Sequence, residues 1–301
     1  MRRMPSSPPH ELRPRLFVLA YRMLGSRQEA DDVVQDAQER WLRYGSEVRA
    51  ARPWLEQVVV RLALDRLKSA RARREVYVGP WLPEPVLTDD EGLRGHPVDR
   101  QSISLAFLLV LERLSALERA AFVLVESFDY TPSEVGVLLE RSEAAIRQLL
   151  HRAREHVREN RPRFAPTREA HHEILSIFLD ALREGDVKRL EALLVAEARA
   201  VTDGGGHAKA ALQVVKGADR VARFLEGVFR QLEAGTTLQV VEINGWPTLV
   251  AISKTVVESV AQIETDGTRI YSLLGISNPE KLGALTAHTV RMSQGAALRR
   301  P

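Results

Sequence analysis

Arginine side chains gather in two stretches of the first half of the chain, and their planar guanidinium groups suit bidentate contacts with phosphates. The first stretch contains Arg61, Lys68, Arg71, Arg73 and Arg74, and the second runs from Arg141 to Arg163. Trp54 precedes the first stretch, and aromatic rings among cations suit a surface that holds phosphates and stacks on unpaired bases. The pattern indicates nucleic-acid binding. A buried Trp54 and the arginine bias of a genome rich in G and C are the alternatives that the residues leave open.

The stretch from Tyr130 to Arg154 has the spacing of a helix-turn-helix. Thr131 before Pro132 and Ser142 before the second apolar run are typical N-cap residues. Arginine and glutamine on the second helix can contact base edges in a major groove, while the other cations hold phosphates. We therefore expect DNA contacts from Ser142, Glu143, Arg147, Gln148, His151, Arg152 and Arg154. Taken alone, the segment also fits a helical hairpin with a solvated charged face.

Acidic residues cluster between Glu29 and Glu39 and include Asp31, Asp32 and Asp36. A docking face for a basic partner explains this group better than a metal site, because no histidine lies nearby and the acids have arginines at helical i,i+4 spacing. We expect no metal.

Nothing in the second half has the spacing of a catalytic or cofactor site. The glycines after Asp203 match neither a Walker loop nor a dinucleotide fingerprint. Spacing gives no acidic partner to His171, His172 or His207. We therefore expect no catalytic residue and no cofactor, so the protein is not an enzyme.

Composition narrows the class of protein. The 301 residues are 45% hydrophobic and carry 43 basic and 40 acidic side chains, which is the balance of a soluble globular chain of about two domains. No cysteine is present, so disulfides, thiolate nucleophiles and cysteine-ligated metals are excluded. The N-terminus lacks the apolar run of a signal peptide, and no stretch of about 20 apolar residues follows. We expect a cytoplasmic protein without membrane contact.

Periodicity predicts two all-α domains followed by an α+β domain. Helices are expected over 10–44, with a break at Gly25–Ser26, and from Pro53 onwards. Helical spacing continues from about 102 to 128. Strands are expected at Ala198–Thr202, at Thr237–Ile243, in the run Leu249–Ile263 with a break near Lys254, and at Thr268–Ile276. The tail 284–301 is expected to fray. The domain boundaries are 1–75, a proline-rich linker at 76–101, 102–166 and 167–301.

Together these segments resemble bacterial sigma factors of the extracytoplasmic-function (ECF) group. Arg27–Asp36 with Arg40–Leu42 is similar to the group's polymerase-docking helix, Pro53–Leu67 to its promoter-melting helix, and Tyr130–Arg154 to its upstream-element reader. The resemblance implies that Asp31, Asp32, Gln35, Asp36 and Trp41 bind core RNA polymerase.

Three further strings resemble signatures of the ECF subgroup that carries a C-terminal SnoaL-like domain, a cone-shaped α+β fold. They are Tyr77–Pro85 in the linker, Asp203–Gly206, and Asn278–Leu282. His207 stands where the subgroup usually has lysine, and Gln38–Glu39 where many members have an apolar or aromatic residue.

The resemblance implies a factor that directs polymerase to promoters and is regulated in cis. The linker would meet the two C-terminal strings through Tyr77, Trp81, Leu82, Pro83, Asp203, Gly204, Gly205, Gly206, Asn278, Pro279, Lys281 and Leu282. Since SnoaL-like folds elsewhere hold ligands and are sometimes catalytic, a small ligand of unknown kind is also considered. The competing hypotheses are a DNA-binding front half fused to a ligand-sensing or isomerase- or cyclase-like domain, and a dimeric repressor.

Overall fold

The computed structural model of the protein describes residues 9–90, 103–160 and 166–297, and the side chains of 70–75, 160 and 289–297 fall outside that description. The chain divides into two compact units. The first comprises Met1–Glu75, Asp89–Ile103 and Phe107–Arg161, and the second comprises Val76–Thr88, Ser104–Ala106 and Pro162–Pro301. The beginning of the expected linker therefore belongs to the unit that contains the C-terminal domain.

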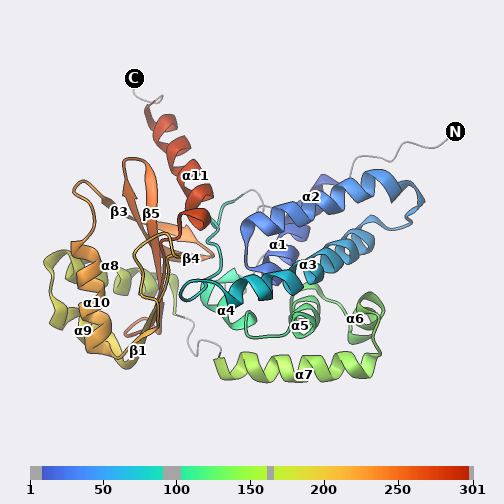
Figure 1. The fold of residues 1–301 in the computed structure, drawn as a ribbon, viewed down its shortest axis with the longest axis horizontal. Helices are drawn as coiled ribbons and strands as arrows, with labels where there is room; N and C mark the ends of the chain where they lie inside the picture. The colour runs from blue at the N-terminus through green and yellow to red at the C-terminus, as the bar shows by residue number, and fades with distance from the viewer. Residues whose placement is uncertain (1–8, 91–102, 161–165, 298–301) are drawn as a thin grey trace. The chain divides into compact units, whose positions relative to one another are not determined.

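The first unit begins with three helices packed through their apolar faces: α1 (Arg13–Leu24), α2 (Arg27–Tyr44) and α3 (Ala51–Glu75) (Figure 1). Gly25 ends α1 in the left-handed region, with φ of 67°, where a glycine carries no Cβ penalty. Ser26 then caps α2, because its Oγ accepts a hydrogen bond from the Glu29 amide at 3.2 Å. The expected break at Gly25–Ser26 is confirmed.

Four helices follow: α4 (Leu105–Leu111), α5 (Ala116–Phe128), α6 (Pro132–Leu139) and α7 (Glu143–Asn160). The expectation of continuous helix from 102 to 128 is wrong, because Ser115 and Glu118 form a capping box that begins a new helix, α5. A second capping box, from Thr131 and Glu134, begins α6. Helices α6 and α7 pack together as the expected helix-turn-helix.

Buried charged groups join α5 to the first three helices within this unit. The Arg119 guanidinium, 2% exposed, donates to the Met23 carbonyl at 2.7 Å and pairs with Glu112 at 2.6 Å. Burial lowers the pKa of Arg119 to about 9. Glu56, 1% exposed, accepts hydrogen bonds from Arg15 on α1 and from the Tyr130 hydroxyl. These contacts tie the helix-turn-helix to the N-terminal helices through polar as well as apolar packing.

The second unit is an α+β domain. Its helices are α8 (Arg168–Glu184), α9 (Val187–Leu193), α10 (Ala218–Arg230) and α11 (Pro279–Ala297), and its strands are β1 (Leu194–Asp203), β2 (Val215–Lys216), β3 (Thr237–Ile243), β4 (Trp246–Ser253), β5 (Val256–Thr265) and β6 (Ile270–Ile276). The strand order is β2-β1-β6-β5-β4-β3, in which β3 to β6 form an antiparallel meander and β1 runs parallel to β6.

Helices α8, α9 and α10 gather on one side of the sheet, and α11 lies on the other (Figure 1). Phe178, Leu225 and Leu273 belong to the apolar cluster between the sheet and the first three of these helices. The expected fold class, two all-α domains followed by an α+β domain, is confirmed.

The C-terminal domain departs from the sequence expectations in three places. Strand β1 is longer than Ala198–Thr202, and the two-residue strand β2 was not expected. The tail 284–301 was expected to fray, but its residues up to Ala297 belong to helix α11, which buries Leu282 and Leu285; residues 298–301 lie outside the described part of the structure. Few large apolar residues mark this segment in the sequence, and its helix depends on tertiary packing, so it was not predicted.

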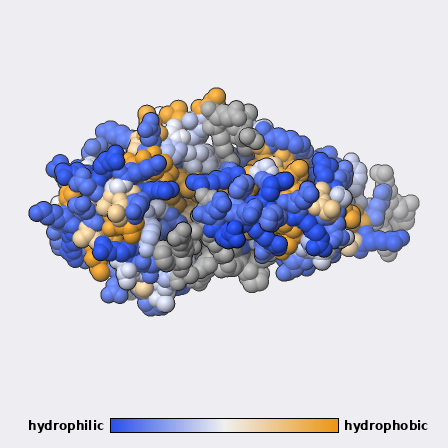
Figure 2. Space-filling model, turned by 90° about the horizontal axis from the view of Figure 1, so that it is seen from below, coloured by the Kyte–Doolittle hydropathy of each residue, from blue (hydrophilic) through white to orange (hydrophobic). Residues whose placement is uncertain are grey.

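The face seen in Figure 2 is largely hydrophilic, with apolar residues scattered across it. Among the described residues, no helix combines the length and apolar character needed to cross a membrane.

The tight turn of the helix-turn-helix depends on Gly136, because a Cβ added there would lie 2.8 Å from the Arg141 carbonyl oxygen. We expect Gly136→Ala to lower the stability of the first unit by about 1–3 kcal/mol, since backbone atoms must shift. Gly227→Ala on α10 is the matched control, because nothing lies within 4 Å of its Cβ position, and alanine there should stabilise the helix by up to about 1 kcal/mol. Thermal unfolding followed by circular dichroism measures both; equal midpoints would contradict the prediction.

Candidate nucleic-acid interface and linker-binding site

The solvent face of α7 carries most of the residues expected to contact DNA. Ser142 caps the helix by accepting a hydrogen bond from the Ala145 amide at 3.2 Å. Ile146 and Leu150 are buried on the opposite face, so Glu143, Arg147, Gln148 and His151 point to solvent. Arg147 is 67% exposed and pairs with Glu143 at 2.6 Å, within its own helix. This face presents an amide and several cations in the arrangement that a major groove accommodates.

Arg152 and Arg154 are half exposed and have acidic partners in the same unit, and their expected DNA contacts stay a prediction. Arg152 pairs with Glu118 at 2.8 Å and Arg154 pairs with Glu126 at 2.6 Å, and both acids belong to α5. Burial raises the pKa of Glu118, but hydrogen bonds from Arg152 and Ser115 outweigh it and lower that pKa below its ordinary value. These two arginines therefore fix α7 against α5, a role that spacing along one helix does not reveal.

Helix α3 carries the cations of the first basic stretch. Arg61 pairs with Glu140 of the helix-turn-helix at 2.8 Å. Lys68 is 76% exposed and lies 3.0 Å from Asp65. The backbone of α3 extends through Arg71, Arg73 and Arg74, whose side chains lie outside the described part of the structure.

The two tryptophans of the first helices pack edge to face, with ring centroids 5.7 Å apart. Trp41 is 5% exposed, and a Cβ on Gly45 would approach its indole to 2.7 Å. Trp41 is therefore packed in the core of this unit, and its expected contact with polymerase stays a prediction. Trp54 packs against Trp41 and is half-buried. This exposure is compatible both with a core role and with stacking on an unpaired base.

The acidic face of α2 is largely paired with arginines of the same unit. Asp31 contacts Arg13 and Arg27, both at 3.0 Å. Arg66 reaches Asp36 at 2.9 Å and Asp32 at 3.5 Å. Burial raises the pKa of Asp31, while Arg27 and Arg13 oppose the increase. Asp32 is 56% exposed and Asp36 is 45% exposed, and Gln35 and Glu39 are also exposed, so the face is accessible along much of its length.

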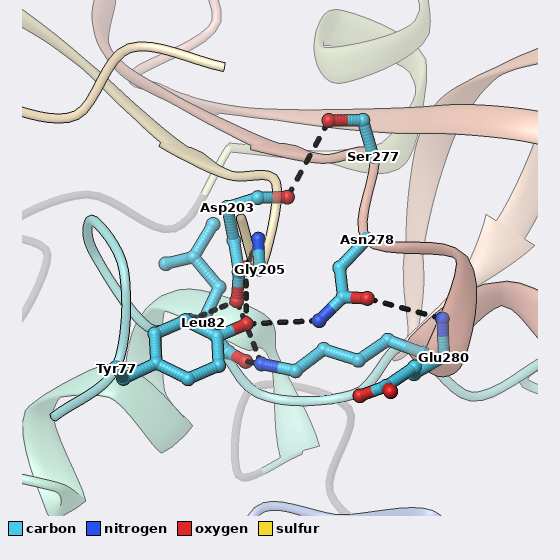
Figure 3. A network of polar contacts seen from close by, with 8 residues as sticks. Tyr77, Leu82, Asp203, Gly205, Ser277, Asn278 and Glu280 are labelled. Carbon is cyan, nitrogen blue, oxygen red and sulfur yellow. Dashed lines mark hydrogen bonds and ion pairs between the residues drawn. The ribbon is translucent and has the colours of Figure 1, made fainter. Parts of the chain in front are cut away.

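The linker and the two C-terminal strings meet at Asp203, a fully buried carboxylate at the end of β1 (Figure 3). We call residues 76–88 the strap. The Tyr77 hydroxyl donates to Asp203 Oδ1 at 2.5 Å, and the Leu82 amide donates to Oδ2 at 2.8 Å. Lys281 Nζ lies 2.6 Å from Oδ2 and also donates to the Leu82 carbonyl. We call this arrangement the charged clasp.

Asn278 and the glycines complete the charged clasp. Asn278 Nδ2 donates to the Tyr77 oxygen at 2.9 Å, and its Oδ1 accepts from the Glu280 amide at 3.0 Å, at the start of α11. The Gly205 amide donates to Asp203 Oδ1 at 3.1 Å. Burial, followed by the hydrogen bond to Asp203, raises the pKa of Tyr77, so its hydroxyl keeps its proton.

Lys281 also lies over two aromatic rings of the strap. Its Nζ is 4.2 Å from the Trp81 ring centroid and 5.3 Å from that of Tyr77, both within range of a cation–π attraction. Only 11% of its side chain is exposed. Charge neutralisation by Asp203 and ring contacts together explain how a lysine is tolerated here.

The remaining residues of the three strings support this contact. Leu82, Pro83, Gly204 and Leu282 are buried. Gly206, with φ of 77°, leaves room for Val78, which a Cβ would approach to 3.3 Å. Pro279 is exposed and begins α11. His207, in the position of the usual lysine, lies 3.7 Å from Glu280 at the surface and outside the charged clasp.

A second attachment of the strap was not anticipated from the sequence. The Val86 amide donates to Asn244 Oδ1 at 2.9 Å, and the Asn244 amide donates to the Val86 carbonyl at 2.8 Å. The Thr88 amide donates to the Glu242 carbonyl at 2.9 Å, and the Gly245 amide to Thr88 Oγ1 at 2.9 Å. We call this the neutral clasp. Asn244 and Gly245 form the turn between β3 and β4, and both have a positive φ, 51° and 79°.

The histidines considered for chemistry differ in their surroundings: His172 is half exposed, with its Nε2 3.8 Å from a Glu242 carboxylate oxygen. His171 is 2% exposed, and its Nε2 contacts the Ile263 carbonyl at 3.2 Å. Burial lowers its pKa. Within the described residues, no three histidine, aspartate or glutamate side chains gather where they would hold a metal ion.

Comparisons with known proteins place both helical segments in one family. Residues 10–73 match the family Sigma-70 region 2, and residues 104–157 match Sigma-70, region 4. The chain is 38% identical over 227 residues to the ECF RNA polymerase sigma factor SigJ of Mycobacterium tuberculosis, across 74% of this chain and 73% of that protein. It is 30% identical over 282 residues to the probable ECF RNA polymerase sigma factor SigI of the same species, across 90% and 92%.

The similarity to SigJ extends to its solved structure. The crystal structure of M. tuberculosis SigJ superimposes with a TM-score of 0.71 at 32% identity, and the match covers 90% of this chain and 95% of that one.

Gly205 is essential to the charged clasp, because a Cβ there would lie 2.3 Å from the Asn278 amide nitrogen. Gly205→Ala should therefore destabilise the second unit through this clash, in addition to the left-handed backbone cost of about 1–2 kcal/mol. Gly185→Ala isolates the backbone cost, because Gly185 has φ of 65°, close to the 61° of Gly205, and nothing within 4 Å. Differential scanning calorimetry should show a lower unfolding temperature for Gly205→Ala than for Gly185→Ala, and equal temperatures would refute the steric argument.

Proposed function

The chain belongs to the extracytoplasmic-function RNA polymerase sigma factors, and from this premise we propose how its residues divide the work. A sigma factor binds core RNA polymerase and directs it to promoters for initiation. The first unit contains the regions that dock and read DNA, and the SnoaL-like second unit controls them in cis. The family is one of transcription factors, so the isomerase- or cyclase-like alternative is not pursued.

Polymerase docking is assigned to the outer face of α2. Asp32 and Gln35 make the first contacts, since both are exposed on this face. Asp31 and Asp36 hold arginines of their own unit, and a basic partner surface would compete with those arginines. Such complementarity steers association more than it adds affinity. Trp41 supports α2 from the core.

Promoter contacts are assigned to α7 and α3. Arg147, Gln148 and His151 on the solvent face of α7 read the upstream element, while Ser142 and Glu143 set the start of the helix. The cations of α3, Arg61 to Arg74, hold backbone phosphates during melting. Arg61 would exchange Glu140 for a phosphate when DNA binds.

Control in cis is assigned to the charged clasp, and the buried Asp203 carboxylate is the observation that carries this proposal. The strap begins directly after α3, so holding Tyr77 and Leu82 restrains the end of a promoter-binding helix. We assign the C-terminal domain a restraining role. The small ligand considered for this domain stays a prediction.

Arg147→Ala should weaken promoter binding by about 1–3 kcal/mol if the arginine reads a base, without lowering thermal stability. Arg152→Ala is the contrasting variant, because it removes the ion pair between α7 and α5 and should lower the unfolding temperature of the first unit. Affinity is measured by fluorescence anisotropy of polymerase holoenzyme on labelled promoter DNA over a salt series. Unchanged affinity and salt slope for Arg147→Ala would refute the recognition-helix assignment.

Trp81→Ala should raise transcription several-fold in a purified system with core polymerase and a cognate promoter, because it removes the nearer ring over Lys281 and loosens the restraint. Val256→Ala, an exposed apolar residue of the same unit, is the control and should leave output unchanged. A point variant is a cleaner test than truncation after residue 168, which would expose Leu82, Val86 and Leu87 of the strap. Equal output from Trp81→Ala and the parent would remove the proposed control, and no transcription from the parent would overturn the assignment of function.

A further inference from the structure

The two clasps hold the strap by different chemistry. In the charged clasp a buried carboxylate and a buried ammonium group share their partners, Tyr77 and Leu82. In the neutral clasp Val86 and Thr88 are held by amide, carbonyl and hydroxyl groups, and no bond there involves a formal charge. No group of one clasp is hydrogen-bonded to a group of the other in the described contacts.

The charged clasp is expected to open as a unit. Asp203 accepts hydrogen bonds from Tyr77, Leu82 and Lys281 at once, so losing any one of them weakens the others. Removing one charge of a buried pair leaves the other desolvated and unpaired, which favours complete opening and hydration of both groups.

The neutral clasp is expected to survive that event. Its hydrogen bonds continue the edge of the sheet at the end of β3, where Leu87 forms a bridge with Ile243. Pro83 and Pro85 lie between the clasps, and neither has an amide N–H through which sheet-like pairing would spread along the strap.

The length of free chain after α3 depends on whether the charged clasp is closed. Glu75 ends α3 and Tyr77 follows two residues later, so the closed clasp leaves about 7 Å of extended chain between them. When only the neutral clasp holds, the free chain from Glu75 to Val86 spans about 36 Å at full extension. Opening the charged clasp alone therefore releases the end of the promoter-melting helix while the strap stays attached to the second unit.

We propose that the strap opens in two separable steps, and that the charged clasp controls promoter melting by α3 and leaves upstream-element binding by α7 unaffected. The proposal rests on the cis control described under the proposed function and names the step on which it acts. The Val86–Thr88 segment then acts as a hinge that keeps the strap attached to the second unit while the charged clasp opens and closes.

Hydrogen exchange in the full chain tests the separability. Lys281→Met should speed exchange of the Leu82 amide by at least about tenfold while leaving the Val86 and Thr88 amides unchanged. Asn244→Gly is the matched variant, since glycine accepts the positive φ and only the side-chain acceptor is lost; it should free the Val86 amide and leave Leu82 protected. Equal acceleration of both segments by either variant would overturn the two-step opening.

A milder variant guards against general unfolding. Tyr77→Phe deletes one hydroxyl from the charged clasp and should speed Leu82 exchange less than Lys281→Met does, in the same segment. Exchange across β4 and β5 should stay at the parent rate in all three variants. Faster exchange there for Tyr77→Phe as well would show that the charged clasp is part of the domain's folding core, against the proposal.

Transcription with core polymerase tests the assigned step. Lys281→Met should raise output several-fold from a duplex promoter and leave output from a pre-melted promoter unchanged, with equal promoter affinity on both. Asn244→Gly should match the parent on both templates. An equal increase on both templates would overturn control of melting while leaving cis control intact. Unchanged output on both, despite faster Leu82 exchange, would overturn the proposed cis control itself.

Discussion

The buried ion pair between Asp203 and Lys281 is the constraint around which the second unit is arranged. It joins the end of β1, the first turn of α11 and the strap, three segments far apart in the sequence. The Asp203 carbonyl also accepts from the Ser277 and Asn278 amides, at 2.8 and 3.1 Å, so both the backbone and the side chain of this residue are engaged. A buried pair of this kind adds little net stability compared with apolar packing, but it strongly penalises any arrangement that separates the partners. That property suits a contact that is either fully made or fully open.

Charged side chains of the first unit also form ion pairs with one another. Arg66 holds Asp32 and Asp36, Arg152 and Arg154 hold acids of α5, and Arg61 holds Glu140. Many of the charged residues expected to contact polymerase or DNA therefore have partners within the chain. A promoter phosphate would replace the exposed Arg61–Glu140 pair at small cost, because solvent-exposed ion pairs contribute little to stability. The Arg152 pair differs, because its partner Glu118 is largely buried. The buried charges of Arg119 and Glu56, by contrast, belong to the framework that supports the helix-turn-helix.

The sequence predicted the helix-turn-helix well because Thr131, Pro132 and Ser142 act locally, and it brought the three clasp strings together through resemblance. It did not predict that Trp41 is buried, since a helical stripe does not state what packs against it. The ion pairs of Arg152 and Arg154 were not predicted, because their acidic partners lie on another helix. The break at Ser115 was missed, although Glu118 three residues later is a capping-box signal. Helix α11 and the neutral clasp depend on contacts between distant segments, which spacing along the chain does not encode.

A double-mutant cycle at the clasp tests most directly whether Asp203 and Lys281 act as one unit. The free energies of opening are measured by exchange of the Leu82 amide in the parent, Asp203→Asn, Lys281→Met and the double variant. Each single change leaves a buried group without its counter-charge or donor, so the double variant should be destabilised far less than the sum of the two. The account predicts a coupling free energy of about 1–3 kcal/mol. Additive effects, within about 0.5 kcal/mol, would contradict it.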